Sequence, residues 1–335
     1  MISIVSRWGK SVWGLFFHQR NCIFQLFYVS LLTLSYSVLF YEAWNTMNWF
    51  DRLLAIVLAS FCTGLFLRVS FVDPGVITRE NVNLMKKYPE QEALYPRGRV
   101  CRTCKTIKIP RSKHCSVCDH CVARFDHQYV YRHLSFIYHC LVAVNSILYQ
   151  FFHVYLVWVN TCIAEHNYNA FFFFLVANIC GSGHLVYLLC SVFLEKMTHI
   201  LTNAEDESRE MLVQVLTDII SSPENARMAF VASLAIAAWF FVSLLLGCQM
   251  GRIVRNCTAN EHFKRQHLHK EHANDDIPTT KRPIAMDMAW GGVGLIDADQ
   301  DRTLSADEIE YNPYNKGLVH NIHDAFDITR KDKTS

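Results

Sequence analysis

Six residues that can bind a transition metal lie within one short stretch of the chain. Residues 101–121 contain two Cys-x-x-Cys pairs, and a histidine directly precedes the second pair. A Cys-x-x-Cys turn folds two thiolates onto one ion, and zinc prefers four such soft or borderline ligands in a tetrahedron. The spacing therefore predicts a zinc-binding module, with free structural cysteines as the alternative. The ligand-type residues are Cys101, Cys104, His114, Cys115, Cys118 and Cys121.

This stretch has little else from which to build a stable fold. It is rich in lysine and arginine and contains no long apolar run, so bound metal would supply much of its folding energy. The spacer between the two cysteine pairs does not fit a ββα finger, and no H-x₃₋₅-H follows. The formal net charge of +2 gives no general attraction for polyanions. We therefore expect no nucleic-acid partner.

The elements that must position this module are long apolar stretches. Of the 335 residues, 51% are hydrophobic and 19% are charged, whereas about a quarter of the residues of a soluble protein are charged. A membrane-spanning helix needs about 20 apolar residues. The composition predicts an all-α polytopic membrane protein with four transmembrane helices, and it excludes a secreted disulfide module, a disordered chain and a soluble enzyme. The four stretches are 23–44, 53–72, 171–194 and 229–250.

The distribution of charge predicts the orientation of these spans. Residues 73–127 carry eleven Lys and Arg, whereas residues 195–228 carry three Lys and Arg against seven acids. Because cytosolic loops carry the excess of Lys and Arg, we expect both termini and the zinc module in the cytosol, and a luminal loop at 195–228. A fifth stretch at 140–157 would move the basic C-terminal tail to the lumen, so it is not counted as a span. Residues 1–22 lack a small-residue cleavage site and are expected to be a cytosolic tail.

The run from Cys101 to His127, with Pro-Arg-Ser-Lys-His-Cys inside it and Asp126-His127 at its end, resembles the cysteine-rich domain of the DHHC protein S-acyltransferases. Three other segments are similar to motifs of that family. They lie after the second span, after the last span and near the C-terminus. The motif residues are Asp73, Pro74 and Gly75 (DPG motif), Thr258 and Glu261 (TTxE motif, with Ala259 in place of its second Thr), and Asn312, Tyr314 and Asn321 (C-terminal aromatic motif).

The resemblance implies two structural zinc sites. One site would use Cys101, Cys104, His114 and Cys121. The second site would use Cys115, Cys118, Cys162 and a histidine that is missing from the motif, and His153 is a candidate for that fourth position.

The resemblance also implies acyl transfer from palmitoyl-CoA to a protein cysteine through an acyl-enzyme thioester. A free cysteine has a pKa of about 8.5, so a neighbouring histidine held by a carboxylate is needed to activate it. Asp126 and His127 match these two catalytic roles. The acyl chain would lie among the spans, and the implied partners are the lipid bilayer, acyl-CoA and membrane-associated protein substrates. The implied location is an endomembrane (ER or Golgi) or the plasma membrane.

The motif breaks directly after His127, where the family continues with His-Cys and this chain has Gln128-Tyr129. The family pattern resumes at Trp158, so residues 128–156 resemble an insertion that contains the doubtful apolar stretch. Tyr129 occupies the position of the nucleophile by count, and a phenol with a pKa of about 10 is a poor substitute. Cys140, within the insertion, is an alternative nucleophile.

Two hypotheses follow from this break. The favoured one is a palmitoyltransferase whose sequence carries a retained intron translated in frame. The alternative is an inactive, zinc-bearing membrane scaffold of the same family.

Two weaker patterns lie outside the module. Residues 205–220 place three apolar side chains on one helical face, which fits a short helix on the protein or on the membrane surface. Residues 297–308 match most of an EF-hand loop but lack its glycine, so an acidic turn is the simpler interpretation. The predicted division is a tail at 1–22, two helices in 23–72, a cysteine-rich domain at 73–170, two helices in 171–250 and a tail at 251–335.

Overall fold

A computed structural model describes residues 22–115, 118–127, 159–203, 217, 221–273 and 305–326. The predicted stretch 140–157 lies outside these residues, as do segment 205–220 except for Thr217, and residues 297–304 of the acidic turn. The chain forms two compact units, each assembled from segments that are far apart in the sequence. One unit comprises Met1–Phe24, Arg68–Phe171 and Cys248–Ser335, and the other comprises Gln25–Leu67 and Phe172–Gly247.

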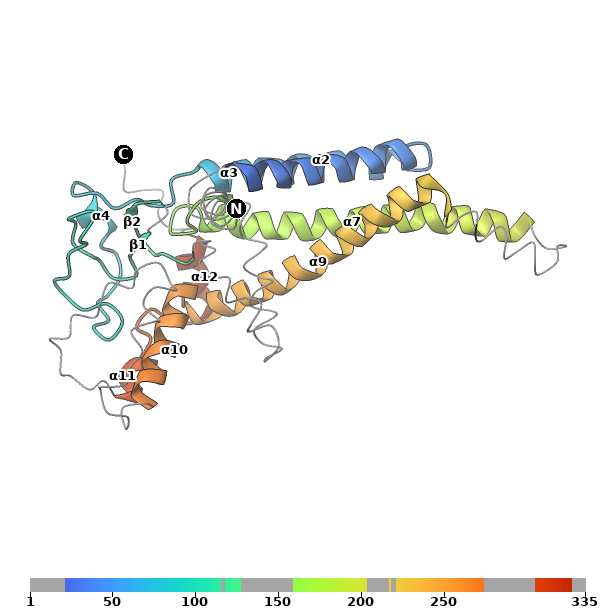
Figure 1. The fold of residues 1–335 in the computed structure, drawn as a ribbon. Coiled ribbons are helices and arrows are strands. Elements are labelled where there is room, and N and C mark those ends of the chain that lie inside the picture. Colours follow the sequence, from blue (N-terminus) through green and yellow to red (C-terminus); the bar gives the residue numbers. More distant parts are fainter. Residues whose placement is uncertain are drawn as a thin grey trace, which may run out of the picture. The chain divides into compact units, whose positions relative to one another are not determined.

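Four long helices dominate the described residues (Figure 1). Each is long and apolar enough to cross a membrane, which confirms the predicted all-α fold with four membrane-spanning helices. They are α2 (Ile23–Ala43), α3 (Trp49–Phe71), α7 (Tyr168–Asn203) and α9 (Pro223–Arg255).

Helices α7 and α9 contain 36 and 33 residues and extend beyond the apolar stretches that predict them. Both continue into the segment 195–228. The start of α9 is set locally, because Pro223 occupies its first position, where a missing N–H costs nothing. The Ser222 hydroxyl oxygen accepts a hydrogen bond from the Asn225 N–H at 3.2 Å, and this bond satisfies one of the unpaired donors of the first turn.

The second unit has an apolar core to which all four long helices contribute. Leu39 and Ala55 are completely buried in this core. At one end of the helices, the Arg227 Nε donates to the Glu42 Oε1 at 2.8 Å, and so joins the start of α9 to the end of α2. The buried core residues are Tyr36, Leu39, Ala43, Met47, Ala55, Leu185, Leu188, Leu189, Val192, Met228, Val231 and Ala235.

The first unit contains the cysteine-rich module and the segments that follow α9. Its one described sheet is an antiparallel hairpin in which His114 lies opposite Cys121. Its apolar clusters are small, and five of their eleven buried members are cysteines, as the sequence predicts for a metal-dependent fold. The elements are α4 (Val82–Met85), β1 (Lys113–Cys115), β2 (His120–Val122), α10 (Ala259–Ala273), α11 (Ala306–Glu310) and α12 (Leu318–Phe326).

Helix α11 begins within the predicted acidic turn. The Ser305 hydroxyl accepts from the Glu308 N–H, and the Glu308 carboxylate accepts from the Ser305 N–H at 3.0 Å. This is a capping box, which satisfies donors at the helix N-terminus. The carboxylate expected at the last position of a calcium loop therefore caps a helix in this structure.

Candidate metal centres and acid–base pair

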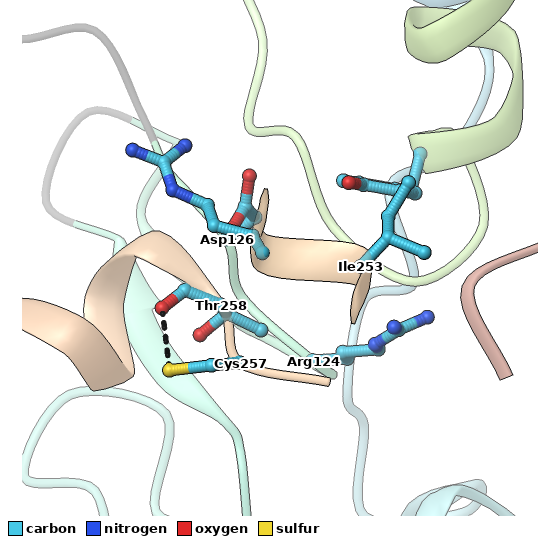
Figure 2. A pocket seen from close by; sticks show the side chains of 7 residues that line it. Arg124, Asp126, Ile253, Cys257 and Thr258 are labelled. Carbon is cyan, nitrogen blue, oxygen red and sulfur yellow. Dashed lines mark hydrogen bonds between the residues drawn. The ribbon is translucent and has the colours of Figure 1, made fainter. Parts of the chain in front are cut away.

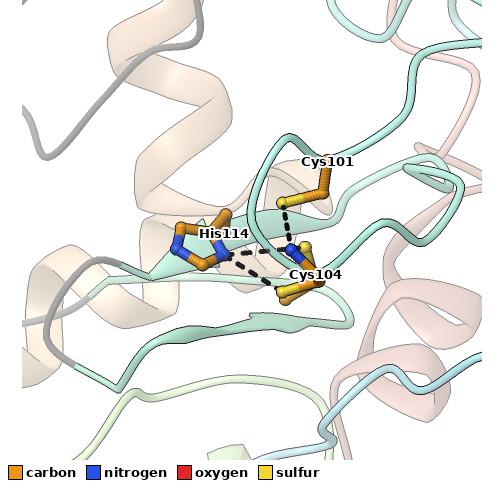
Figure 3. Close-up of side chains that lie close together, drawn as sticks. Cys101, Cys104 and His114 are labelled. Carbon is orange, nitrogen blue, oxygen red and sulfur yellow. Dashed lines mark hydrogen bonds between the residues drawn. The ribbon is translucent and has the colours of Figure 1, made fainter.

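The first predicted group of metal ligands is brought together in the structure. Cys101, Cys104, His114 and Cys121 each present one ligand atom, and these atoms all lie within 4.8 Å of one another. Figure 3 shows His114 facing the turn that carries Cys101 and Cys104. The Cys104 N–H donates to the Cys101 sulfur at 3.4 Å, and Lys105, directly after the turn, has a φ of 55°. The turn therefore closes tightly around its two sulfur atoms.

The second cysteine pair repeats this geometry. The Cys118 N–H donates to the Cys115 sulfur at 3.1 Å, and Asp119 after the turn has a φ of 56°. Cys162 joins them from a distant segment, with its sulfur 3.2 Å from that of Cys118. These three sulfur atoms lie within 4.8 Å of one another. The candidate fourth ligand, His153, lies outside the described residues.

Both groups have the chemistry and the spacing that zinc requires. Zinc–sulfur bonds of about 2.3 Å in a tetrahedron place neighbouring sulfurs roughly 3.8 Å apart, which fits groups whose ligand atoms all lie within 4.8 Å of one another. Amide donors to the sulfur favour the thiolate form that binds metal. Burial lowers the pKa of His114, which favours the neutral imidazole that can coordinate an ion. The residues therefore fit zinc, with four ligands described at the first centre and three at the second.

Asp126 and His127 form a close pair beside the second group. The Asp126 Oδ2 lies 2.7 Å from the His127 Nδ1, so Nδ1 is the ring atom that donates to the carboxylate, and in the neutral ring Nε2 is the accepting atom. The Nε2 atom is buried and has no hydrogen-bond partner among the described residues. The ring packs edge-on against Phe171 at 5.3 Å. This arrangement presents an oriented base with its accepting atom available.

The carboxylate of Asp126 is also held by the start of α10. Its Oδ1 accepts from the Ala259 N–H at 2.6 Å, and its backbone oxygen accepts from the Asn260 N–H at 3.0 Å. Burial alone raises the pKa of Asp126, but the charge and hydrogen bond of His127, aided by Arg252 and the Ala259 N–H, hold that pKa well below its usual range. The group is therefore ionised at neutral pH.

The segment with the TTxE-like motif forms the N-terminal cap of α10. The Glu261 Oε2 accepts from the Thr258 N–H at 2.8 Å, and the Thr258 hydroxyl accepts from the Glu261 N–H at 3.2 Å. This reciprocal pair is a capping box. It fixes the backbone that donates to Asp126, so the motif positions the acid–base pair from a distant part of the sequence.

Glu261 also binds the fully buried guanidinium of Arg111. The Arg111 Nε and Nη2 donate to the two carboxylate oxygens at 2.7 and 3.0 Å. The guanidinium lies over the rings of Tyr88 and Tyr314, at 4.8 and 4.3 Å from their centroids. Burial alone lowers the pKa of Arg111, but the Glu261 carboxylate more than offsets it and raises that pKa above its usual value. The guanidinium is therefore charged, and its bonds to Glu261 cross-link the module to α10.

The C-terminal aromatic motif satisfies the carbonyl groups at the end of α9. The Asn321 amide donates to the Val254 oxygen at 2.7 Å, and the Asn312 amide donates to the Arg255 oxygen at 2.7 Å. The last carbonyls of a helix have no partner within the helix, so these two amides replace the missing donors. Asn256 has a φ of 45°, which ends the helix, and its side chain donates to the Tyr314 oxygen at 2.8 Å.

The Asp-Pro-Gly motif makes a turn that is bound to the module. The Asp73 Oδ1 accepts from the N–H groups of Gly75 and Val76 at 3.0 and 3.1 Å. The Gly75 oxygen accepts from the Ala123 N–H at 2.9 Å, and Gly75 has a φ of 104°. A side chain is strained at such a φ, so this turn requires glycine.

A small pocket opens beside Asp126. Figure 2 shows Cys257 and Thr258 on its wall with Arg124 and Ile253, and Tyr168 and Arg252 complete the lining. The Cys257 thiol donates a weak hydrogen bond to the Thr258 oxygen at 3.5 Å. The two arginines give the pocket a positive character.

The two sides of the interrupted motif lie next to each other. The Ile163 N–H donates to the His127 oxygen at 3.0 Å, and the His127 N–H donates to the Ile163 oxygen at 3.3 Å. This antiparallel bridge pairs the residue directly before the predicted insertion with a residue a short way after it. His127 and Ile163 are therefore close enough for the uninterrupted family sequence, with His-Cys in place of residues 128–156, to connect them. Adjacent backbones need only a short loop between them.

Sequence reasoning placed all the described metal ligands and the Asp126–His127 pair, and the structure brings them together. The two candidates for the nucleophile position, Tyr129 and Cys140, lie outside the described residues. Two buried positions were not singled out as site residues, Arg111 and Asn256. Arg111 is part of the quoted Pro-Arg-Ser-Lys-His-Cys run, but its surroundings there are basic and give no indication that it is buried. Its partners Asn256 and Glu261 are 145 and 150 residues away in the sequence.

Comparison with known proteins agrees with this geometry. The profile of the family described as DHHC palmitoyltransferase matches residues 95–157 and 134–266, together about half of the chain. The two matches overlap at 134–157, in the region of the predicted insertion. They also include every described zinc ligand, the acid–base pair and the TTxE-like segment.

Individual relatives carry the same family name. The chain is 30% identical over 190 residues to "Palmitoyltransferase ZDHHC4" of Rattus norvegicus, covering 55% of this chain and 47% of that protein. It is 39% identical over 104 residues to "Palmitoyltransferase swf1" of Aspergillus fumigatus, covering 31% of this chain and 27% of the relative. It is 27% identical over 231 residues to "Palmitoyltransferase ZDHHC14" of Homo sapiens, covering 62% of this chain and 38% of the relative. The chain spans less than half the length of these relatives. With the metal-ligand groups, the Asp-His pair and the family profile in agreement, the chain belongs to the DHHC palmitoyltransferase family.

Proposed function

We propose that this chain is a protein-cysteine S-palmitoyltransferase whose acyl-transfer loop is interrupted by residues 128–156. The observation that carries the proposal is the Asp126–His127 pair, with Nδ1 bound to the carboxylate at 2.7 Å and Nε2 left without a partner among the described residues. A histidine held in this way is what a thiol nucleophile requires. The pair stands directly before the interruption, where the family sequence has its cysteine.

The proposed reaction transfers a fatty acyl group from palmitoyl-CoA to a cysteine of a membrane-associated protein. The His127 Nε2 takes the proton of the nucleophilic thiol, and the thiolate attacks the thioester carbon of palmitoyl-CoA. A carbon–sulfur bond forms to the enzyme, the bond to the sulfur of CoA breaks, and CoA takes the proton and leaves as a thiol. The thiolate of the target protein then attacks the acyl-enzyme, which restores the free enzyme thiol.

Each described part of the site has a role in this proposal. Asp126 holds His127 in the reactive tautomer, and the α10 cap holds Asp126. Arg124 and Arg252 line the adjacent pocket and suit the phosphate groups of CoA. Zinc, when bound to the two ligand groups, supplies structural cross-links and no reaction step.

We also propose the setting of the reaction. The four long apolar helices place the chain in a bilayer, where the acyl chain of the donor is soluble. The basic segment 73–127 favours a cytosolic module with both termini in the cytosol, in an endomembrane or the plasma membrane.

One observation favours a second function. In the chain as written, Gln128 and Tyr129 follow His127, so the cysteine of the motif is missing. A member without this cysteine would be a zinc-bearing membrane scaffold that binds acyl-CoA or proteins but forms no thioester.

Two experiments decide between these functions. Sequencing the mature transcript tests whether a spliced message joins Asp126-His127 to His-Cys-Val-Trp. In parallel, a variant with residues 128–156 replaced by His-Cys is purified next to the chain as written, with His-Ser in the same place as the matched control. Each protein is incubated with labelled palmitoyl-CoA and then treated with hydroxylamine, which cleaves thioesters.

We expect label that is sensitive to hydroxylamine on the His-Cys variant only, and its loss when His127→Ala is added. If the His-Cys variant stays unlabelled although it is folded and carries zinc, the transferase proposal fails and the scaffold remains. If the chain as written is labelled, acylation does not require the cysteine of the family motif, and the reaction uses another nucleophile.

A further inference from the structure

Helices α3 and α7 carry a pair of ionisable side chains that face each other. Both helices are long and apolar enough to cross a membrane, and both residues belong to the same compact unit. The His184 Nε2 lies 3.5 Å from the Asp51 Oδ1, and the two side chains are only 10% and 15% exposed. Ionisable residues within spanning helices are unfavourable to bury, and they commonly mark an ion or substrate site.

The imidazole of His184 has no hydrogen-bond partner among the described residues. Its Nδ1 and Nε2 atoms are both buried and unpaired, while its ring stacks with that of Tyr187, with the centroids 6.3 Å apart. The distance of 3.5 Å between Nε2 and the Asp51 Oδ1 is longer than the about 2.7–3.2 Å of an N–H···O hydrogen bond. A buried polar group without a partner commonly indicates a bound water or ion.

The carboxylate of Asp51 is oriented so that one oxygen is left for a ligand. Its Oδ2 accepts from the Asn48 Nδ2 at 2.7 Å, and the Asn48 Oδ1 accepts from the Asp51 N–H at 2.8 Å. The guanidinium of the next residue, Arg52, lies over the Trp44 ring at 4.8 Å. In the described part of the chain, His184 is the one basic residue within ion-pair distance of this carboxylate. Its negative charge is therefore not neutralised by a lysine or arginine there.

The distance between the two facing atoms fits a shared metal ion. Zinc lies about 2.0–2.1 Å from a histidine nitrogen and about 2.0–2.2 Å from a carboxylate oxygen, so two such ligands of a tetrahedral ion are roughly 3.4 Å apart. The His184 Nε2 and the Asp51 Oδ1 are 3.5 Å apart. The hydrogen bond from Asn48 to the other carboxylate oxygen is of the kind that orients a metal-binding carboxylate.

We propose that Asp51 and His184 bind a divalent transition-metal ion of the zinc class between α3 and α7, with water completing its coordination. Imidazole and carboxylate ligands suit such an ion. The ion satisfies the His184 Nε2, neutralises the Asp51 carboxylate and cross-links the two helices. The site contains no sulfur ligand, so it is distinct from the two cysteine centres, and the inference does not depend on acyl transfer.

The test measures the zinc that binds to the full chain in detergent micelles. A site completed by water binds its ion loosely, so the wild-type protein, His184→Gln and Asp51→Asn are dialysed against the same micromolar concentration of free zinc. Mass spectrometry of the metal then gives the zinc bound per chain. Size-exclusion chromatography and helical circular dichroism show whether each protein is folded.

The matched control is His269→Gln. His269 also lies beside a carboxylate, but its Nε2 is at a hydrogen-bonding distance of 2.9 Å from the Glu310 Oε1, and both side chains are exposed. This control measures zinc that binds to a histidine–carboxylate pair at the surface.

We expect His184→Gln and Asp51→Asn each to bind one zinc ion per chain fewer than the wild-type protein, and His269→Gln to bind as many as the wild type. Equal zinc content in the wild type and the folded variants would overturn the proposal, because the pair would then hold only water or a proton. A loss in only one of two folded variants would also overturn it, since both side chains must be ligands. If one variant does not fold, the comparison of the other with His269→Gln decides.

Discussion

At the level of single residues, Asp126 connects the acid–base pair to the rest of the module. One carboxylate oxygen receives the His127 Nδ1–H, and the other receives the Ala259 N–H at 2.6 Å. The orientation of His127 therefore depends on the backbone at the start of α10. The capping box made by Thr258 and Glu261 sets that backbone, so we expect changes in the box to affect the base without touching it.

The first prediction concerns Asp126→Asn, which keeps the size of the side chain but removes its charge. We expect a loss of about 1–3 kcal/mol of stability at neutral pH, because hydrogen bonds to a buried charged group are lost or weakened. The pKa of Asp126 is held below its usual range, so its stabilisation is complete above the ordinary aspartate pKa of about 3.9 and disappears as the pH falls below that value. Thermal unfolding of both proteins in detergent from pH 7 to pH 3 measures the difference.

Comparing the two proteins at each pH cancels the acid release of zinc, which affects both equally. The difference between their midpoints should shrink only below about pH 4. A difference that stays constant into acid would mean that the Asp126 charge is not what stabilises the module.

The second prediction concerns the buried pair of Arg111 and Glu261, both of which have fully buried side chains. Removing one partner leaves an unpaired buried charge, which costs about 3–5 kcal/mol, so Arg111→Met should strongly destabilise the module. Arg97 pairs with Glu90 at the surface, with 69% of the arginine side chain exposed, and Arg97→Met should cost less than about 1 kcal/mol. Denaturation of the two variants under one condition tests the contrast, and equal losses would contradict it.

The residues of this site differ in how well the sequence predicts them. The cysteines and the Asp126–His127 pair were predictable because their chemistry is tied to short spacings along the chain. Arg111 was not singled out, because among neighbouring basic residues it resembles part of a solvated surface. Its burial depends on Glu261 and Tyr314, which are far away in the sequence and reach it only in the folded chain.

At the level of elements, the apolar stretches predicted the four long helices but not their ends. Hydrophobicity predicts which segment of a helix can lie in lipid, whereas capping residues determine where the helix begins and ends. Pro223 and Ser222 start α9 before its apolar stretch begins, and Asn256 ends it after that stretch. Residue types that cap helices can be recognised in a sequence. The same types also occur at many positions that do not cap a helix, so the helix ends could not be predicted from them.

The third prediction concerns the Asp73-Pro74-Gly75 turn. Gly75 has a φ of 104°, and a residue with a Cβ pays about 1–2 kcal/mol or more in such a conformation. The space itself is not the obstacle, since an added Cβ would meet the His166 ring at 3.6 Å, an ordinary contact. We therefore expect Gly75→Ala to lower the thermal midpoint through strain in the backbone.

The matched control is Gly251→Ala in α9, where no heavy atom lies within 4 Å of an added Cβ. Alanine is favoured over glycine inside a helix by roughly 0.5–1 kcal/mol, so this variant should be neutral or slightly more stable. Destabilisation by both substitutions to the same extent would show that the φ of Gly75 is not the cause.

At the level of the whole molecule, the charge pattern predicts which side of the membrane each segment occupies. We expect an epitope placed after Ser335 to be accessible when only the plasma membrane is permeabilised, and an epitope inserted beside Thr217 to need full permeabilisation. The reason is the excess of Lys and Arg in 73–127 and of acids in 195–228, because cytosolic loops carry the excess of basic residues. Immunofluorescence under the two conditions measures this, and the reverse pattern would refute the topology.

The last prediction joins the interrupted motif to the metal content of the molecule. Four ligands are described at the first centre, but only three thiolates, of Cys115, Cys118 and Cys162, are described at the second. A three-thiolate centre that takes its fourth ligand from solvent exchanges zinc more readily than a closed four-ligand site. We therefore expect two zinc ions per chain as isolated, of which one is released to a chelator much faster than the other.

Replacing residues 128–156 by His-Cys supplies the missing histidine next to the thiolates, because the bridge between His127 and Ile163 holds the two ends of the new loop together. Both zinc ions should then be released slowly. Gln-Cys in the same place is the matched control, since it restores the nucleophile without the ligand, and it should keep the fast phase. Release followed with a colorimetric zinc indicator separates the three proteins. A slow second zinc in the chain as written would mean that residues 128–156 already close the centre, and the segment would then have to be regarded as a genuine part of the fold.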